Sequence, residues 1–97
     1  MNCERCAELQ LRYDIRSPDA LAKAIRVIHA NLDDGTIEQV LRAGLGASTT
    51  PFRSVGHNGP WPDLLLYEFE CRSCGARFRL SVETYHGGGG EWFPAEL

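Results

Sequence analysis

The clearest alternation of apolar and polar residues lies in the last third of the chain. Apolar residues occupy every second position in 65–69 and again in 78–82, which is typical of half-buried β-strands. A turn over 71–76 would make the two strands one antiparallel hairpin, and a shift of one residue would place charges on its buried face. The opposite residues in this register are Leu65 with Val82, Tyr67 with Leu80, Phe69 with Phe78, Glu68 with Arg79, and Glu70 with Arg77.

A helical pattern follows residue 17. Ser17 is a suitable N-cap, Pro18 suits the first helical position, and Asp19 favours the positive end of a helix. Gly35 can adopt the left-handed conformation that ends many helices. The apolar stripe that predicts this helix consists of Leu21, Ile25, Ile28 and Leu32.

Two shorter segments have weaker patterns. Residues 8–16 alternate imperfectly and predict a half-buried strand, whose apolar face would carry Leu9, Leu11, Tyr13 and Ile15. Residues 36–42 suit either a helix or a strand, because helical spacing coincides with residues that favour strands. We favour a short second helix there.

The remaining segments are rich in turn-forming residues. Residues 43–63 contain much glycine, serine, threonine and proline and predict a long loop, of the kind that often binds partners. The glycine run 87–90 predicts a flexible connection to a short terminal strand at 91–93, with Trp92 and Phe93 on the core. A phosphate-binding loop is disfavoured, because Glu91 follows where such a loop needs lysine and serine or threonine.

Length and composition place these elements in one α+β domain over residues 1–97. Its small antiparallel sheet would carry one main helix on its apolar face. The 97 residues are 43% apolar, and their formal net charge of −3 provides no basic field for nucleic acid or anionic membrane. No stretch approaches the about 20 apolar residues of a membrane span, and the start has no apolar signal region. We therefore expect a cytoplasmic protein without a membrane partner.

All four cysteines lie in two Cys-x-x-Cys pairs, Cys3 with Cys6 and Cys71 with Cys74. Two such turns can supply the four thiolates of a closed structural zinc site, and a reducing compartment favours metal over disulfide. The pairs are separated by far more than the about 15 to 20 residues found in ordinary zinc ribbons. The pattern thus predicts one structural Zn²⁺ per chain that joins the start of the chain to the hairpin tip.

Other chemistry at the cysteines fits less well. A rubredoxin-like iron site and a redox dithiol are the competing interpretations, but a redox cysteine usually begins a helix, and neither pair precedes a convincing helical pattern. Hydrolytic zinc keeps one position open for water, whereas four thiolates close the shell.

The segment Cys71-Arg72-Ser73-Cys74-Gly75 resembles the zinc knuckle of zinc-ribbon and rubredoxin-like proteins. Cys3-Glu4-Arg5-Cys6 resembles the first half of such a ribbon, with Ala7 where a glycine is usual. The resemblance covers two turns and one hairpin. It implies structural zinc at the four cysteines and, often, binding of nucleic acid or protein.

Histidines are the next candidates for chemistry. His29 falls within the predicted helix and is expected to have a structural role, because a histidine needs a placed partner to act as a base. His57 lies in the long loop, and His86 precedes the glycine run. Ser54, His57 and Asp63 could be combined into a catalytic set, but their spacing does not require one.

Two surfaces could bind a partner. Arg5, Arg72, Arg77 and Arg79 would cluster near the metal, yet Glu68 and Glu70 would neutralise two of them, so a solvated charge ladder is favoured over a nucleic-acid face. The long loop offers Phe52, Arg53, His57 and Trp61. Its two aromatic residues are either anchors for a partner or plugs at the edge of the core.

Together these patterns favour a small non-enzymatic protein that binds a protein partner. Size and acidic charge suggest an immunity or antitoxin-like inhibitor that would cover a basic site on a toxin. The alternative is a zinc-ribbon factor that binds nucleic acid or takes part in transcription, and an enzyme is the third hypothesis. The candidate partner residues are Phe52, Arg53, His57, Trp61, Arg72 and Arg77.

Overall fold

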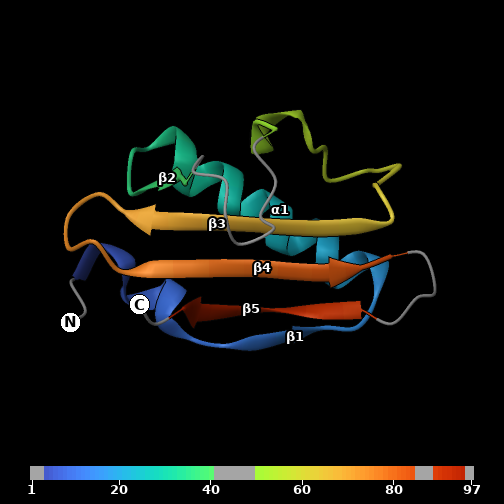
Figure 1. Cartoon of the computed structure of the whole chain (residues 1–97), viewed down its shortest axis with the longest axis horizontal. Coiled ribbons are helices and arrows are strands. Elements are labelled where there is room, and N and C mark those ends of the chain that lie inside the picture. Colours follow the sequence, from blue (N-terminus) through green and yellow to red (C-terminus); the bar gives the residue numbers. More distant parts are fainter. Residues whose placement is uncertain (1–3, 41–49, 85–88, 96–97) are drawn as a thin grey trace.

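The computed structural model describes residues 4–40, 50–84 and 89–95. Its five strands form one antiparallel sheet in the order β1-β5-β4-β3-β2, and α1 lies across one face (Figure 1). The predicted α+β class is confirmed. The elements are η1 (Glu4–Gln10), β1 (Tyr13–Ile15), α1 (Pro18–Asp33), β2 (Ile37–Gln39), η2 (Phe52–Ser54), β3 (Leu64–Cys71), β4 (Arg77–Glu83) and β5 (Gly89–Ala95), where η marks a 3-10 helix.

The central hairpin of β3 and β4 has the predicted register. Phe69 pairs with Phe78, and Glu70 pairs with Arg77. Alternate residues of both strands point toward α1 and are buried, while the residues between them form the opposite face. The alternation in the sequence was sufficient to predict the register of these two strands, because a short turn connects them directly.

The helix α1 begins and ends where its capping residues predict. The hydroxyl of Ser17 accepts a hydrogen bond from the Ala20 amide at 3.1 Å, and Gly35 has a φ of 80° just beyond the helix. The Asp34 carboxylate accepts a hydrogen bond from the Thr36 amide at 2.9 Å, and hydrogen bonding with Thr36 lowers the pKa of Asp34. This turn leads the chain directly from α1 into β2.

The core between α1 and the sheet contains an aromatic cluster. Phe52 of η2 contacts Tyr67 and Phe69 edge-on, with ring centroids 4.8 and 5.3 Å apart. Trp92 of β5 stacks on Phe78 at 5.5 Å. Such pairs add to the stabilisation that comes from area burial, so η2 and β5 are both held to the central hairpin through rings.

The strand predicted over 8–16 is wrong in its first half. Residues 8–10 belong to η1, and Leu11 is 70% exposed. Within 8–16, only residues 13–15, which form β1, pair with another strand, β5. In a 3-10 helix residues i and i+3 lie on the same side, which lets η1 bury both Cys6 and Leu9. An extended chain would have placed these two side chains on opposite faces.

The short helix predicted over 36–42 is also wrong, because the segment contains the edge strand β2. It pairs with the end of β3, where Ile37 lies opposite Cys71. The Arg72 amide donates to the Thr36 carbonyl at 3.0 Å, and the Val40 amide donates to Glu68 at 2.8 Å. These main-chain bonds to a distant strand outweigh a helical spacing that extends over less than two turns.

The described part of the long loop, residues 50–63, is fixed to the sheet by hydrogen bonds. The Gln39 side chain donates to the Thr50 carbonyl at 2.8 Å and accepts from the Phe52 amide at 2.7 Å. At its other end, the Thr84 amide donates to Asp63 at 2.8 Å. The rest of the predicted loop, 43–49, lies outside the described residues.

The terminal strand is longer than predicted. Gly89 and Gly90, expected in a flexible connection, belong to β5. Both pair with β4, and Gly90 also pairs with β1. Trp92 is buried, as expected, and Phe93 is half-buried. None of the helices among the described residues has the length and hydropathy of a transmembrane segment.

The close approach of β4 to Gly90 generates a stability prediction. A Cβ at this position would overlap the carbonyl oxygen of Ser81, which is part of the neighbouring strand. Gly90→Ala should therefore lower the free energy of unfolding by about 2 kcal/mol or more, because the backbones must separate. Gly56→Ala is the matched control, since an added Cβ there meets nothing within 4 Å. Urea denaturation of both variants measures the effect, and equal stabilities would contradict this packing.

Candidate metal centre

The candidate metal centre forms where η1 meets the turn between β3 and β4 (Figure 1). Cys71 is the last residue of β3, and its amide donates to the Ala76 carbonyl at 2.8 Å. Its carbonyl accepts a hydrogen bond from the Gly75 amide at 2.9 Å, with Gly75 at a φ of 79°. This tight turn places Cys74 beside Cys71, and η1 brings Cys6 to the same point.

The three described cysteine sulfurs lie within 4.8 Å of one another. The Sγ atoms of Cys6 and Cys74 are 3.6 Å apart, well beyond the about 2.05 Å of a disulfide bond. Zn–S bonds of about 2.3 Å in a tetrahedron separate two sulfurs by about 3.8 Å, so the spacing fits a single thiolate-bound ion. Three of the four predicted ligands are thus positioned to bind a metal, and Cys3 lies outside the described residues.

The cluster is largely shielded from solvent. Cys6 and Cys71 are 0% and 1% exposed, and Cys74 is half-buried. The Gln10 side-chain amide donates to the Cys6 sulfur at 3.5 Å, and Trp92 Nε1 donates to the Leu9 carbonyl at 2.9 Å. The Trp92 bond holds η1 against the sheet, whereas the Gln10–Cys6 bond lies within η1. Gln10 was not among the predicted site residues, although its place four residues after Cys6, one helical turn on, was a usable signal.

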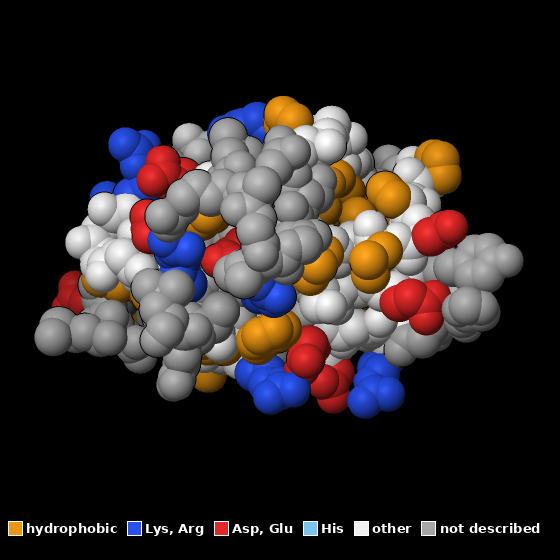
Figure 2. Space-filling view, in the orientation of Figure 1, with side chains coloured by type: hydrophobic (Ala, Val, Ile, Leu, Met, Phe, Trp, Pro, Cys, Tyr) orange, Lys and Arg blue, Asp and Glu red, His pale blue; other side chains and the backbone are white. Residues whose placement is uncertain are grey.

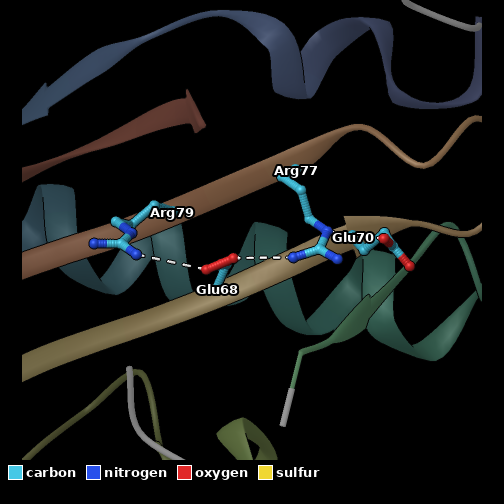
Figure 3. A network of polar contacts seen from close by, with 4 residues as sticks. All are labelled: Glu68, Glu70, Arg77 and Arg79. Carbon is cyan, nitrogen blue, oxygen red and sulfur yellow. Dashed lines mark hydrogen bonds and ion pairs between the residues drawn. The ribbon is translucent and has the colours of Figure 1, made fainter. Parts of the chain in front are cut away.

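Beside the centre, four charged residues form a network on the face of the sheet opposite α1 (Figure 3). Arg77 Nε donates to Glu70 at 2.8 Å, and Arg77 Nη1 donates to Glu68 at 3.1 Å. Arg79 reaches the other oxygen of Glu68 at 3.5 Å. The two predicted cross-strand pairs are present, and the Arg77–Glu68 contact links them diagonally.

This charge network is less solvated than the predicted ladder. The side chains of Glu68 and Arg77 are only 6% and 10% exposed. Hydrogen bonding to Glu70, followed by its charge and that of Glu68, outweighs burial and raises the pKa of Arg77. Arg77, proposed from the sequence as a partner-binding residue, is instead committed to two carboxylates.

The other predicted partner residues fall into two groups. Phe52 is 1% exposed and has the core role that was its alternative, while Trp61 and His57 are half-buried in the loop. Arg53 and Arg72 are exposed, and they line one surface hollow that Phe52 also lines. The structure therefore brings three of the six residues together, on the side of the molecule that carries β2.

The predicted structural role of His29 agrees with its contacts. Its Nε2 lies 2.8 Å from the Val55 carbonyl, and its ring packs 5.4 Å from Phe52. The Ser54 hydroxyl donates to the Pro51 carbonyl at 2.7 Å, which gives no support to a catalytic set with His57 and Asp63. His86 lies outside the described residues. Within the described ranges, the cysteine cluster is the only close group of three potential metal ligands.

Because the charge network is buried, replacing Glu68 should lower the free energy of unfolding much more than replacing Glu91, which lies in a more exposed ion pair. Glu68→Ala should destabilise the protein by about 3 to 5 kcal/mol, because Arg77 would remain buried with one partner removed. Glu91→Ala removes a comparable ion pair with Arg12, whose side chain is 67% exposed, and should cost about 1 kcal/mol or less. Denaturant unfolding measures both, and similar costs would contradict a desolvated network.

Comparison with protein-family models, with curated proteins and with solved structures finds no match for this chain. The arrangement of the cysteine sulfurs, and no relative, therefore identifies this region as the candidate metal centre.

Proposed function

We propose that this chain is a non-enzymatic domain that binds a protein partner and is held together by one structural Zn²⁺. The observation that carries the metal assignment is the approach of the Cys6, Cys71 and Cys74 sulfurs to within 4.8 Å. Cys3 is the proposed fourth ligand, because it forms the Cys-x-x-Cys pair with Cys6. Thiolate ligands in this number favour zinc in a reducing compartment.

A structural role follows from where the ligands originate. Cys6 comes from η1 and the other two described ligands come from the β3–β4 turn, so one ion would join distant parts of the chain. A domain of 97 residues has a modest core and gains substantially from such a link. Four thiolates would also fill the tetrahedral shell, which leaves no position for an activated water.

The charge distribution favours a protein over a nucleic acid as the partner. Arg77 and Arg79 are bound to Glu68 and Glu70, so they offer little to phosphates. Figure 2 shows acidic and basic side chains interspersed at the lower edge of the face opposite α1. The net charge of −3 is also unfavourable for a nucleic-acid surface. An immunity or antitoxin-like inhibitor remains the narrower form of this proposal.

The metal assignment predicts close to one equivalent of zinc in protein purified under reducing conditions. Cys74→Ser should lose most of this zinc and unfold at a lower denaturant concentration, because it removes a ligand from the β3–β4 turn. Ser73→Ala, one residue away and exposed, is the matched control and should retain the metal. Elemental analysis and chelator-dependent circular dichroism measure both properties. Metal-free wild-type protein with an unchanged fold would refute the structural site.

The binding assignment predicts a stable complex with one host protein. Affinity purification of the zinc-loaded chain after nuclease treatment should retain this partner in constant stoichiometry, because phosphate contacts do not hold it. Mass spectrometry identifies the partner, and reconstitution from two purified proteins serves as the control. Recovery of nucleic acid, with protein lost after nuclease treatment, would instead support the alternative of a nucleic-acid-binding factor.

A further inference from the structure

The hollow that contains Arg53 and Arg72 has features of a peptide-binding site. We call it the β2 groove. It has a volume of about 290 Å³ and lies where β2 meets the end of α1 and η2 (Figure 1). Its apolar lining includes Leu32, Pro51 and Phe52, and its charged lining consists of Glu38, Arg53 and Arg72. A cavity of about 150 Å³ accommodates a benzene ring, so this volume suits one large side chain together with a flanking group.

The apolar part of the groove is held in place by contacts with the core. Phe52, which lines the groove, is 1% exposed, and its ring contacts Tyr67 and Phe69 edge-on. Its amide is bound by the Gln39 side chain at 2.7 Å, which joins η2 to β2. A groove with fixed walls costs a ligand less ordering energy than a flexible loop would.

Arg72 provides the charge that gives the groove its selectivity. It is exposed, and no hydrogen bond or ion pair joins its side chain to any residue in 4–40, 50–84 or 89–95. Its Nη1 atom lies 3.7 Å from the position a Cβ would take at Gly35, so the guanidinium lies close to the end of α1. A guanidinium without a partner can bind a carboxylate through two parallel hydrogen bonds.

The second arginine has a partner that it can exchange. Arg53 forms an ion pair with Asp33, and both side chains are more than half exposed. Exposed pairs of this kind contribute about 1 kcal/mol or less, so a ligand carboxylate can compete for Arg53. Glu38 is the acidic residue of the groove, and it leaves the lining with one net positive charge.

We propose that the β2 groove binds an acidic segment of the protein partner. One aliphatic or aromatic side chain of that segment packs on Leu32 and Pro51, beside Phe52, and a neighbouring aspartate or glutamate binds Arg72. This inference rests on the proposed function and specifies the chemistry of the partner. It differs from the inhibitor hypothesis, in which the partner offers a basic site.

The metal centre controls how Arg72 is presented. Arg72 lies between Cys71 and Cys74, and its amide is bound to the Thr36 carbonyl at 3.0 Å. An ion that holds both cysteines therefore holds the backbone from which the guanidinium extends. Zinc removal should release this turn and weaken binding at a groove whose apolar wall is fixed separately by Phe52.

Selection from a displayed library of random 12-residue peptides tests the groove. The zinc-loaded chain should enrich peptides with aspartate or glutamate next to leucine, isoleucine or phenylalanine. Fluorescence anisotropy with the enriched peptides should show at least tenfold weaker binding to Arg72→Ala and a smaller loss for Arg53→Ala. Zinc content and circular dichroism of each variant establish that it is folded.

The matched control is Arg16→Ala, which removes the same charge. Arg16 is exposed and precedes α1, whose 16 residues span about 24 Å, so it lies far from the β2 groove. Its peptide affinity should stay within twofold of the wild type. Equal losses for Arg16→Ala and Arg72→Ala would overturn the proposal, since they would indicate a general charge effect.

Three further outcomes separate this inference from the proposed function. Enrichment of basic peptides, or of none, would overturn the acidic-segment proposal even if the chain retains zinc and a protein partner. Arg72-dependent binding of a single-stranded oligonucleotide would overturn both the acidic-segment proposal and the proposed function of binding a protein. Loss of the zinc site with retained binding of acidic peptides would support the groove while refuting its control by the metal.

Discussion

Three cysteine sulfurs converge beside the tip of the β3–β4 hairpin. This convergence is the constraint that joins η1, at the start of the described chain, to the central hairpin. Three sulfurs are gathered within 4.8 Å of one another, and two of these cysteines are almost completely buried. A bound cation would attract all three sulfurs as its ligands. Because Cys6 comes from η1, the same ion would hold η1 against the β3–β4 turn and the neighbouring β5. The Trp92–Leu9 hydrogen bond reinforces the same junction.

The charge network of Glu68, Glu70, Arg77 and Arg79 orders the face of the sheet that lies opposite α1. Glu68 and Arg77 are largely removed from water, so the ion pair between them must compensate for the hydration that each charge has lost. Because their partners are spaced along β3 and β4, any slip between these strands would leave buried charges unpaired. The register that buries the aromatic core on one face is therefore also the register that satisfies the charges on the other.

The metal centre and the β2 groove are neighbours because a single short segment belongs to both. Cys71 and Cys74 face η1, while Arg72 between them reaches toward the end of α1. β2 completes the arrangement, since its pairing with the end of β3 fixes the Arg72 amide. An ion bound at the candidate centre would thus influence binding at the proposed groove through the backbone, without contacting a ligand.

The sequence by itself determined those parts of the fold whose partners are close along the chain. The β3–β4 register followed from alternation across one short turn, and α1 followed from Ser17, Pro18 and a regular apolar stripe. The two Cys-x-x-Cys pairs identified the candidate metal ligands for the same reason, because each pair is local. Three of these ligands meet in the structure.

Contacts between distant residues decided the rest. Cys6 and Leu9 share one face only because η1 packs against the turn and Trp92, and Ile37 is in a strand because the end of β3 offers main-chain partners. The burial of Phe52, and of the Glu68–Arg77 pair, also depends on packing against residues that are distant in the sequence. Local patterns encode periodicity and capping, whereas tertiary packing determines which surface is buried, and it is this packing that brings Arg72 to the groove.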